Sequence, residues 1–173
     1  MNSPQPESEI VRRIAASDET AFRNLYVIYA ESLFRYFWSR LADPELARDF
    51  VQELFTRVWS HRARLDPDRS IKRYLYTIAE NLLIDHFRRQ DNRNAYLREK
   101  KYRLSRLSGD ENDLAFQLEL AIESLPEKLR TTFLLSRRQD LTHAEIAAIF
   151  HVSVKAVEKR MKKAMNHLRK VLS

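Results

Sequence analysis

The stretch that decides the fold is LTHAEIAAIFHVSVKAVEKRMKKAMNHL, residues 141–168. Thr142 and Glu145 have the spacing of a capping box, in which the threonine hydroxyl accepts from the N–H of Glu145 and the glutamate side chain reaches back. The box predicts a short helix over residues 144–150, followed by a tight turn. Ser153 then stands where a side-chain oxygen can cap a second helix. Two helices joined in this way form a helix-turn-helix.

The second helix has an apolar side and a basic side. Its apolar residues recur at helical spacing: Val154, Val157, Met161, Ala164, Met165 and Leu168. The other side carries Lys155, Lys159, Lys162 and Lys163, with Arg160 beside them. A helix-turn-helix presents its second helix to the major groove of DNA, where cations neutralise phosphates. Lysines alone favour a solvated helix face, but the box, the turn, the cap and the apolar stripe together reverse this and favour DNA binding.

The composition of the 173-residue chain also points to helices. There is one glycine, Gly109, and no cysteine. Strand-rich folds need glycine-bearing turns, so this composition favours helices with short connections. The lack of cysteine excludes disulfides and thiolate metal sites and suits a reducing cytoplasm. No run approaches the ~18 apolar residues of a membrane span, and the polar N-terminus lacks a secretory apolar core. We therefore expect a cytoplasmic protein without direct membrane insertion.

The net charge of +7 is distributed in blocks. Basic residues crowd positions 88–106, the charged residues from 110 to 127 are all acidic, and positions 155–170 are basic again. A basic balance favours a polyanionic partner. Two basic blocks separated by an acidic stretch predict two contact surfaces rather than one.

Helical patterns also fill the first ninety residues. Asp43-Pro44 has the form of a cap followed by proline in the first helical turn, where the missing N–H costs nothing. The helix that follows carries the apolar stripe Leu46, Phe50, Leu54 and Val58. Asp66-Pro67-Asp68 predicts a turn, and residues 74–89 predict another amphipathic helix.

The apolar period fades after Arg89, and the polar segment that follows contains the sole glycine. The fold class predicted is therefore all-α. Two small helical domains, residues 1–92 and 114–173, are joined by a flexible linker over residues 93–113, and the C-terminal domain contains the helix-turn-helix.

These blocks resemble a known family. The C-terminal blocks are LPEKLR (125–130), FLL (133–135), LTHAEIA (141–147) and VSVKAVEKR (152–160). The N-terminal blocks are DFVQELF (49–55), continuing to Trp59, and YLYTIAENLLIDHFRR (74–89). In this order and spacing they resemble bacterial RNA polymerase sigma factors of the extracytoplasmic-function (ECF) type. The resemblance implies a region 2 domain over residues 1–92, which binds core polymerase and recognises the −10 element, and a region 4 domain over residues 114–173, which recognises the −35 element.

The resemblance gives the helix that contains residues 49–59 the task of binding core RNA polymerase, at the coiled coil of its largest subunit. Asp49, Gln52 and Glu53 stand at i, i+3 and i+4, so they share one helix face that can meet basic residues. Phe55 is expected to add apolar contact. The alternative is that the polar residues are merely solvated, while the neighbouring aromatic and aliphatic residues build the core.

Holding an opened −10 strand requires cations for phosphates, rings for stacking and hydrogen-bonding groups for bases. The residues expected to supply them are Lys72, Arg73, Tyr74, Tyr76, Asn81, His86, Arg88 and Arg89. Stacking a base on an aromatic ring contributes ~1–3 kcal/mol. Either tyrosine can instead be a core residue, and one of the two is expected to be.

The −35 element is expected to contact Ser153, Lys155, Ala156, Lys159, Arg160 and Lys163. The family often has glycine in the turn of the helix-turn-helix, where this chain has Phe150-His151-Val152, so mild strain is expected there. The partners implied are core RNA polymerase, promoter DNA and an anti-sigma factor.

No enzyme is predicted. The histidines lack metal-ligand spacing, and there is no glycine-rich phosphate loop and no cysteine nucleophile, so we expect no catalytic residues, no metal and no cofactor. The rival hypothesis is a stand-alone helix-turn-helix regulator that acts without core polymerase. A third is a protein-interaction adaptor with the same fold. Dependence on core polymerase discriminates among them.

Overall fold

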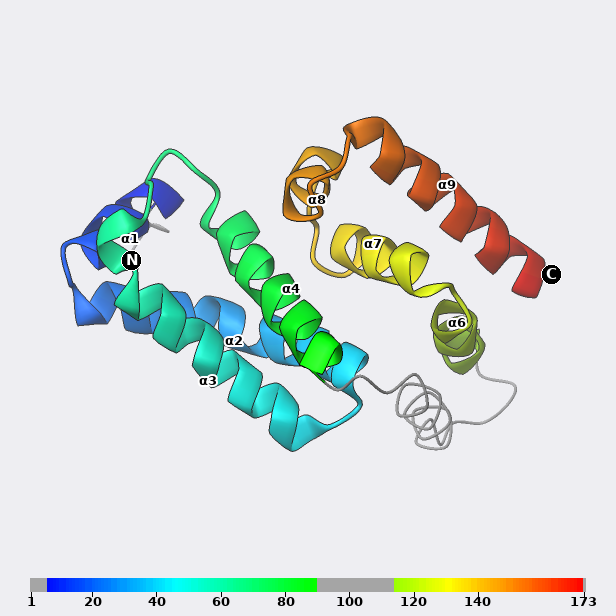
Figure 1. Cartoon of the computed structure of the whole chain (residues 1–173), viewed down its shortest axis with the longest axis horizontal. Coiled ribbons are helices and arrows are strands. Elements are labelled where there is room, and N and C mark those ends of the chain that lie inside the picture. Colours follow the sequence, from blue (N-terminus) through cyan, green and yellow to red (C-terminus); the bar gives the residue numbers. More distant parts are fainter. Residues whose placement is uncertain (1–5, 90–113, 173) are drawn as a thin grey trace. The chain divides into compact units, whose positions relative to one another are not determined.

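The computed structural model describes residues 6–89 and 114–172. Every regular element in these two ranges is a helix, which confirms the all-α fold class (Figure 1). Backbone contacts divide the chain into two compact units, Met1–Arg93 and Asn94–Ser173. The linker predicted over residues 93–113 lies outside the described residues.

The first unit consists of helices that surround one apolar core. In chain order they are α1 (Glu7–Ala15), α2 (Glu19–Leu41), α3 (Pro44–Ser60), the short 3-10 helix η1 (Arg62–Arg64) and α4 (Ile71–Arg89). Helix α2 packs along α3, and α4 packs against both. The core includes Leu25, Leu33, Phe37, Leu54 and Leu75, each almost fully buried.

The connection between α2 and α3 follows from local chemistry. Ala42 ends α2 in the left-handed region, with φ of 56°. The carboxylate of Asp43 then accepts from the backbone N–H groups of Glu45 (2.9 Å) and Leu46 (3.1 Å), and Pro44 occupies the first turn. This confirms the predicted cap and proline. The predicted turn after α3 is also present, closed by the N–H of Arg69 donating to the carbonyl of Asp66 at 3.1 Å.

Two features of the first unit were not part of the sequence-based expectation. The polar N-terminus contains a helix, α1, whose Val11 and Ile14 are buried against the rest of the unit. Ile28 and Trp38 continue the apolar pattern of α2 but are 56% and 45% exposed. Helix α2 has more apolar residues than one side of a helix can bury, so some of them face outward.

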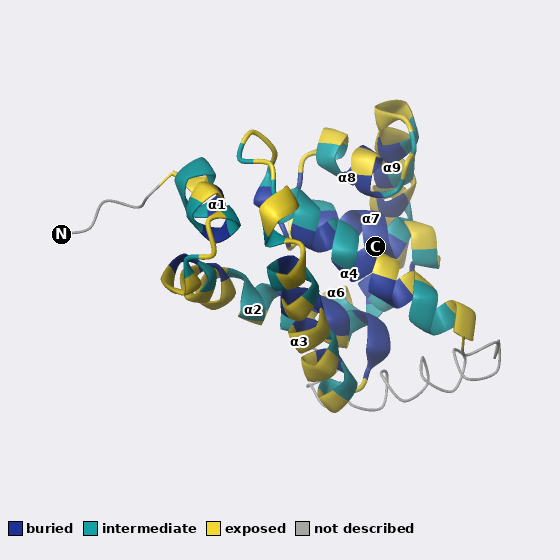
Figure 2. Ribbon diagram, turned by 60° about the vertical axis from the view of Figure 1, so that its left-hand side comes forward, coloured by how far each residue is buried: buried dark blue, intermediate teal, exposed yellow. Residues whose placement is uncertain are grey.

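The second unit consists of α6 (Leu114–Glu123), α7 (Glu127–Arg137), α8 (His143–Ile149) and α9 (Val154–Val171). Helices α6, α7 and α8 all pack against α9. Arg130 is 2% exposed and donates to Glu123 at 2.5 Å and to Glu127 at 2.8 Å, so α6 and α7 are joined by a buried cation with two carboxylates. Figure 2 shows that the long helices carry buried and exposed residues side by side, as amphipathic helices do.

Candidate nucleic-acid and protein interfaces

The polar residues predicted on α3 lie on its solvent side. Asp49, Gln52 and Glu53 are all exposed. The carboxylate of Glu53 accepts from Arg57 at 2.7 Å, one helical turn further along. We call Asp49, Gln52 and Glu53 the α3 face. Its geometry is that of a small acidic and amide surface that a basic partner can approach.

Phe55 does not belong to this surface. It is only 3% exposed, because its ring packs under α2, with centroids 6.0 Å from Phe22 and 4.7 Å from Tyr26. The prediction that Phe55 offers apolar contact to a partner therefore needs correction. Its position on α3 turns the side chain towards α2, and the rings that reach solvent there belong to α2 instead.

Two hollows lie between α2 and α3, and Tyr26 lines both. One, of about 350 Å³, is lined by Glu19, Phe22, Arg23, Tyr26 and Trp59. The other, of about 380 Å³, is lined by Tyr26, Ala30, Glu31, Phe34, Arg48, Val51 and Gln52. Gln52 connects the second hollow with the α3 face. Side chains of a partner helix fit hollows of this kind, which combine aromatic walls with charged rims.

The outer side of α4 brings together four of the predicted −10 residues. Tyr74, Asn81 and Arg88 are spaced seven residues apart, so they lie on one side of the helix, with Arg73 beside them. Asn81 and Arg88 are exposed, and Arg73 and Tyr74 are partly exposed. Partial burial raises the pKa of the Tyr74 phenol. Arg73, Tyr74, Asn81 and Arg88, the α4 outer face, offer a ring, an amide and two guanidinium groups over ~22 Å of helix.

The other predicted −10 residues lie elsewhere on α4. Tyr76 is fully buried, its ring edge-on to Tyr36 at 5.3 Å, and burial raises its pKa to about 12. It cannot stack on a base, so of the two tyrosines it is the core residue. The imidazole of His86 packs edge-on against the rings of Phe50 and Phe87, with ring centroids 5.4 Å apart in each pair, and burial lowers the pKa of His86. Lys72 is partly exposed, and Arg89 is exposed in the last turn.

A buried polar cluster connects α4 to α2. Glu80 is 4% exposed, and it accepts from the Tyr36 hydroxyl and, at 3.2 Å, from Arg40. Burial, together with the adjacent Glu80 carboxylate, raises the pKa of Tyr36 well above its usual range. The cluster lies on the inner side of α4, about 100° around the helix axis from the exposed Asn81, and it constrains how the helix is rotated.

The helix-turn-helix in the second unit has the predicted caps. The N–H of Glu145 donates to the Thr142 hydroxyl at 3.2 Å, and the N–H of Thr142 donates to the Glu145 carboxylate at 2.9 Å, so the capping box is complete. Ser153 caps α9 by accepting from the N–H of Ala156 at 3.2 Å. His151 lies in the left-handed region, with φ of 52°, which is the turn position where glycine costs least.

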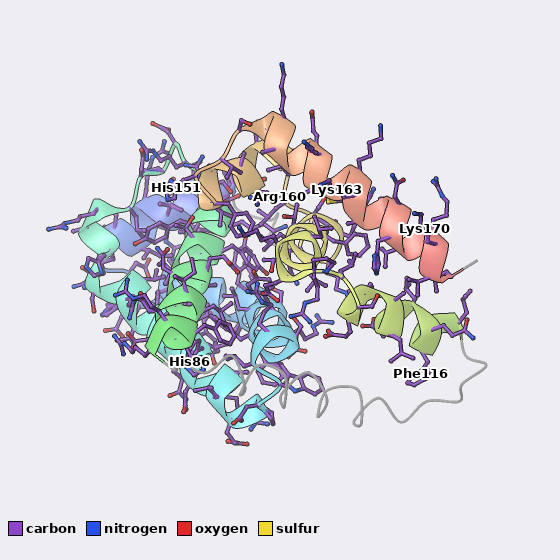
Figure 3. All side chains as sticks on the ribbon, turned by 45° about the vertical axis from the view of Figure 1, so that its right-hand side comes forward. His86, Phe116, His151, Arg160, Lys163 and Lys170 are labelled. Carbon is purple, nitrogen blue, oxygen red and sulfur yellow. The ribbon has the colours of Figure 1, made fainter. Side chains whose placement is uncertain are left out.

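Helix α9 buries one side and exposes its lysines. The buried stripe is Val157, Met161, Ala164 and Leu168, whereas Val154 and Met165, predicted to belong to it, are about 40% exposed. Lys155, Lys159 and Lys163, the α9 lysine face, are exposed at i, i+4 and i+8. Figure 3 marks Lys163 on α9.

The remaining residues predicted to contact the −35 element lie at the start of α9 or beside α8. Ser153 is exposed and Ala156 partly exposed, in the cap and first turn. Arg160 is partly exposed and lies over the ring of Phe150, with its guanidinium carbon 5.7 Å from the ring centroid (Figure 3). Arg160 is therefore held against the end of α8, and this cation–π contact restricts how far it can reach.

No group of three or more His, Cys, Asp or Glu side chains that could hold a metal ion occurs among the described residues. Over the same residues, no helix is both long enough and apolar enough to cross a membrane.

Comparison with known proteins assigns both units. The family model of Sigma-70 region 2 matches residues 25–93, and that of Sigma-70 region 4 matches residues 115–168. The ECF RNA polymerase sigma factor SigW of Bacillus subtilis is 28% identical over 177 residues, covering 94% of each chain. The ferric citrate uptake sigma factor FecI of Escherichia coli is 29% identical over 161 residues, covering 90% of this chain and 92% of FecI. The chain belongs to the ECF family of sigma factors.

Solved structures share the fold of this ECF sigma factor. CnrH, in complex with the cytosolic domain of CnrY, has a TM-score of 0.73 at 23% identity and covers 96% of each chain. The sigma factor RpoE of Bartonella quintana, in complex with the anti-sigma factor NepR, has a TM-score of 0.69 at 18% identity, covering 87% of this chain and 96% of RpoE.

Sequence reasoning missed the α2 side of this ECF sigma factor's candidate protein interface. Phe22, Tyr26 and Phe34 line the hollows beside α3, although none of them was among the predicted site residues. A signal for them was present: the run Tyr26-Val27-Ile28 is apolar around the helix, and a helix that packs on one side cannot bury such a run.

Proposed function

We propose that this ECF sigma factor binds core RNA polymerase and directs promoter-specific transcription initiation, with the work divided between its two units. Residues 1–92 act as region 2, which binds core polymerase and captures the −10 strand. Residues 114–173 act as region 4, which reads the −35 element as duplex. The chemistry of RNA synthesis belongs to the polymerase, and the sigma factor contributes no catalysis, metal or cofactor.

The observation that carries this proposal is the α4 outer face. It lies in the same unit as the α3 face, and its groups are those that an unpaired strand requires. Arg73 and Arg88 supply charge for phosphates, Asn81 supplies an amide for a base edge, and Tyr74 supplies a ring. One stacked base contributes ~1–3 kcal/mol, which helps to hold an opened strand without ATP.

Core polymerase is expected to dock on the α3 face and on the hollows beside it. Asp49 and Glu53 offer carboxylates to basic residues, and Gln52 lies at the rim of one hollow. Interfaces of this kind combine an apolar centre with a polar rim. Tyr26 supports this assignment, because it reaches both hollows and rests on the buried Phe55.

The start of α9 and the α9 lysine face are expected to contact the −35 element, through its bases and through the phosphates that flank them. The residues nearest the start of a recognition helix are the ones that reach base edges, which favours Ser153, Lys155 and Ala156 for direct readout. Lys159 and Lys163 lie further along the helix and suit phosphates. Each phosphate contact adds about 0.9 to the slope of log affinity against log salt concentration.

The same surfaces are those that an anti-sigma factor would cover to keep the free protein inactive, in the cytoplasm where polymerase and promoter meet. A stand-alone regulator is not favoured, because it accounts for the helix-turn-helix but leaves the region 2 unit without a role.

The decisive experiment is run-off transcription on a pool of genomic fragments, with sigma-free core polymerase in the presence and absence of the protein. Discrete transcripts that require both components support a sigma factor and reveal its promoters. DNA binding without core polymerase, and no transcript with it, would instead favour the stand-alone regulator.

Variants separate the two assignments. Replacing Asp49 and Glu53 with lysine should abolish binding to core polymerase while leaving the −35 contacts intact. Replacing Lys155 and Lys159 with alanine should weaken promoter binding, lower its salt slope by about 1 through the lost phosphate contact of Lys159, and leave core binding unchanged. Lys128→Ala, which removes an exposed lysine from α7, is the matched control. Loss of core binding on changing the α9 lysines would contradict this division.

A further inference from the structure

Helix α1 is held tightly to the part of the first unit that leads into α4. It precedes residues 25–93, the segment matched by the region 2 family model. Its Val11 and Ile14 are 1% and 0% exposed, and the helix packs against both α2 and η1 (Figure 1). Beyond its end, the Ser17 hydroxyl accepts from Arg62 of η1 at 2.9 Å. Helix α1 is thus an integral part of the unit and is fixed beside the approach to α4.

One contact extends from α1 to the first residue of α4. The backbone N–H of Ile71 donates to Oε1 of Glu7 at 2.6 Å, across 64 positions of sequence. The first N–H groups of a helix have no partner within the helix, so each needs another acceptor. The Ser70 hydroxyl supplies one locally, accepting from the N–H of Arg73 at 3.2 Å. Glu7 supplies a second acceptor from a separate helix, α1. A carboxylate is favoured there because the N-terminal end of a helix carries a partial positive charge.

The start of α4 is where the α4 outer face begins. Arg73 and Tyr74 lie two and three residues after Ile71, within the turn that the Glu7 and Ser70 contacts hold. Ser70 is adjacent in sequence to this turn and can move together with it. Glu7 cannot, because α1 is fixed to the core through Val11 and Ile14. The Glu7 contact therefore connects the backbone of the first turn of α4 to a separate fixed helix, in addition to the burial of the Ile71 side chain.

We propose that Glu7 is a positioning residue for capture of the −10 strand: its carboxylate sets where α4 begins and so orients Arg73 and Tyr74. The inference rests on the proposed function of α4. Glu7 itself touches neither nucleic acid nor polymerase. It acts as a hydrogen-bond acceptor, so the neutral but isosteric glutamine can replace it, because an amide oxygen also accepts from the N–H of Ile71.

The test compares Glu7→Ala, Glu7→Gln and the control Glu9→Ala in holoenzyme made with the full chain. Glu9 lies on the same helix and pairs only loosely with Arg12, at 3.7 Å on the surface. Three quantities are measured for each variant: affinity for core polymerase, yield of heparin-resistant open complex on a promoter from the run-off experiment, and binding of the holoenzyme to a single-stranded −10 oligonucleotide.

We expect Glu7→Ala to lower the open-complex yield and oligonucleotide binding about fivefold, the factor that corresponds to losing a capping contact of ~1 kcal/mol. Glu7→Gln should remain within about twofold of wild type, Glu9→Ala should be unchanged, and core affinity should be the same in all. Hydrogen exchange of the Ile71 amide should quicken in Glu7→Ala and stay slow in Glu7→Gln.

Three results would overturn the inference. Open-complex yield in Glu7→Ala equal to that of wild type means that the contact positions nothing. An increase in both Glu7→Ala and Glu7→Gln means that the carboxylate competes with the phosphates of the strand. An equal loss of core affinity means a general loss of structure. If the wild-type protein itself gave no transcript that depends on core polymerase, the proposed function would fail first, and this inference would fail with it.

Discussion

The buried cluster of Tyr36, Arg40 and Glu80 offers the sharpest test of what holds α4 in place. In Glu80→Ala, the Arg40 guanidinium, 6% exposed, and the Tyr36 hydroxyl both lose the carboxylate to which they donate. The charge of Arg40 then remains in a poorly solvated site and loses the Glu80 carboxylate at 3.2 Å. We expect a large loss of stability in the first unit.

The magnitude follows from burial. Breaking a buried ion pair by removing one partner costs about 3–5 kcal/mol. At roughly 0.05–0.15 kcal/mol per residue, a unit of about ninety residues has a free energy of unfolding of about 5–13 kcal/mol. Glu80→Ala should therefore remove a quarter or more of this free energy and lower the midpoint of thermal unfolding by at least ~12 °C. Glu80→Gln keeps an acceptor but not the charge, and should cost about 1.5–3 kcal/mol.

Tryptophan fluorescence is the assay, because the chain has two tryptophans, Trp38 and Trp59, and both lie in the first unit. Urea unfolding followed by this signal reports on that unit alone. Glu31→Ala is the control, since it removes an exposed pair with Arg35 at 3.4 Å and should cost no more than about 0.5 kcal/mol.

A comparable shift of the urea midpoint in Glu80→Ala and Glu31→Ala would refute the reasoning, because burial would then have no effect on the cost. The double change of Arg40 and Glu80 to methionine completes the test. It removes both charges while keeping most of the volume, so it should recover most of the stability lost in Glu80→Ala.

Three further predictions concern single residues. His151→Gly relieves a left-handed backbone strain of ~1–2 kcal/mol, but glycine also makes the unfolded chain more flexible, which costs about 0.4–1 kcal/mol. Thermal unfolding followed by circular dichroism should therefore show equal or higher stability, whereas the control Val152→Gly should lower the stability. The pKa of His86 is lowered by burial, so the folded state keeps a neutral imidazole while the unfolded chain protonates near pH 6.5. Stability of the first unit should therefore fall as pH drops from 7 to 5, and His86→Asn should lose less, by tryptophan fluorescence. Arg130→Ala removes the cation that Glu123 and Glu127 share and should destabilise the second unit by about 3–5 kcal/mol. The unfolding transition followed by circular dichroism should shift, whereas the tryptophan transition, which reports on the first unit, should not; an equal shift of both would contradict the assignment to the second unit.

Much of the helix-turn-helix could be predicted from the sequence because its determinants are local. The capping box of Thr142 and Glu145 closes within three residues, and the Ser153 cap also spans three. Such contacts form wherever the backbone becomes helical and do not depend on a distant partner. For the same reason the Asp43-Pro44 start of α3 and the lysine side of α9 were predicted at the correct positions.

Burial of particular side chains could not be predicted in this way. Tyr74 and Tyr76 are two residues apart in the same helix, and their chemistry is nearly the same. Tyr76 is buried because its side of α4 meets Tyr36 and Ser32 of α2, whereas Tyr74 points away from that contact. Phe55 likewise is buried because α2 lies over it. Periodicity shows that a helix has two sides, but not where the edge of the buried side falls.

The sequence by itself determined the helix-turn-helix with its caps, the start of α3, the order of the two units and the family to which the chain belongs. Caps, turns and apolar periods act over a few residues, and they remain legible without any tertiary information. Only the tertiary structure decided which residues reach the surface, that Glu80 is held between Tyr36 and Arg40, and that Glu7 accepts a hydrogen bond from Ile71. These outcomes depend on segments that are 40 to 64 residues apart in sequence and that meet only when the apolar core brings their helices together.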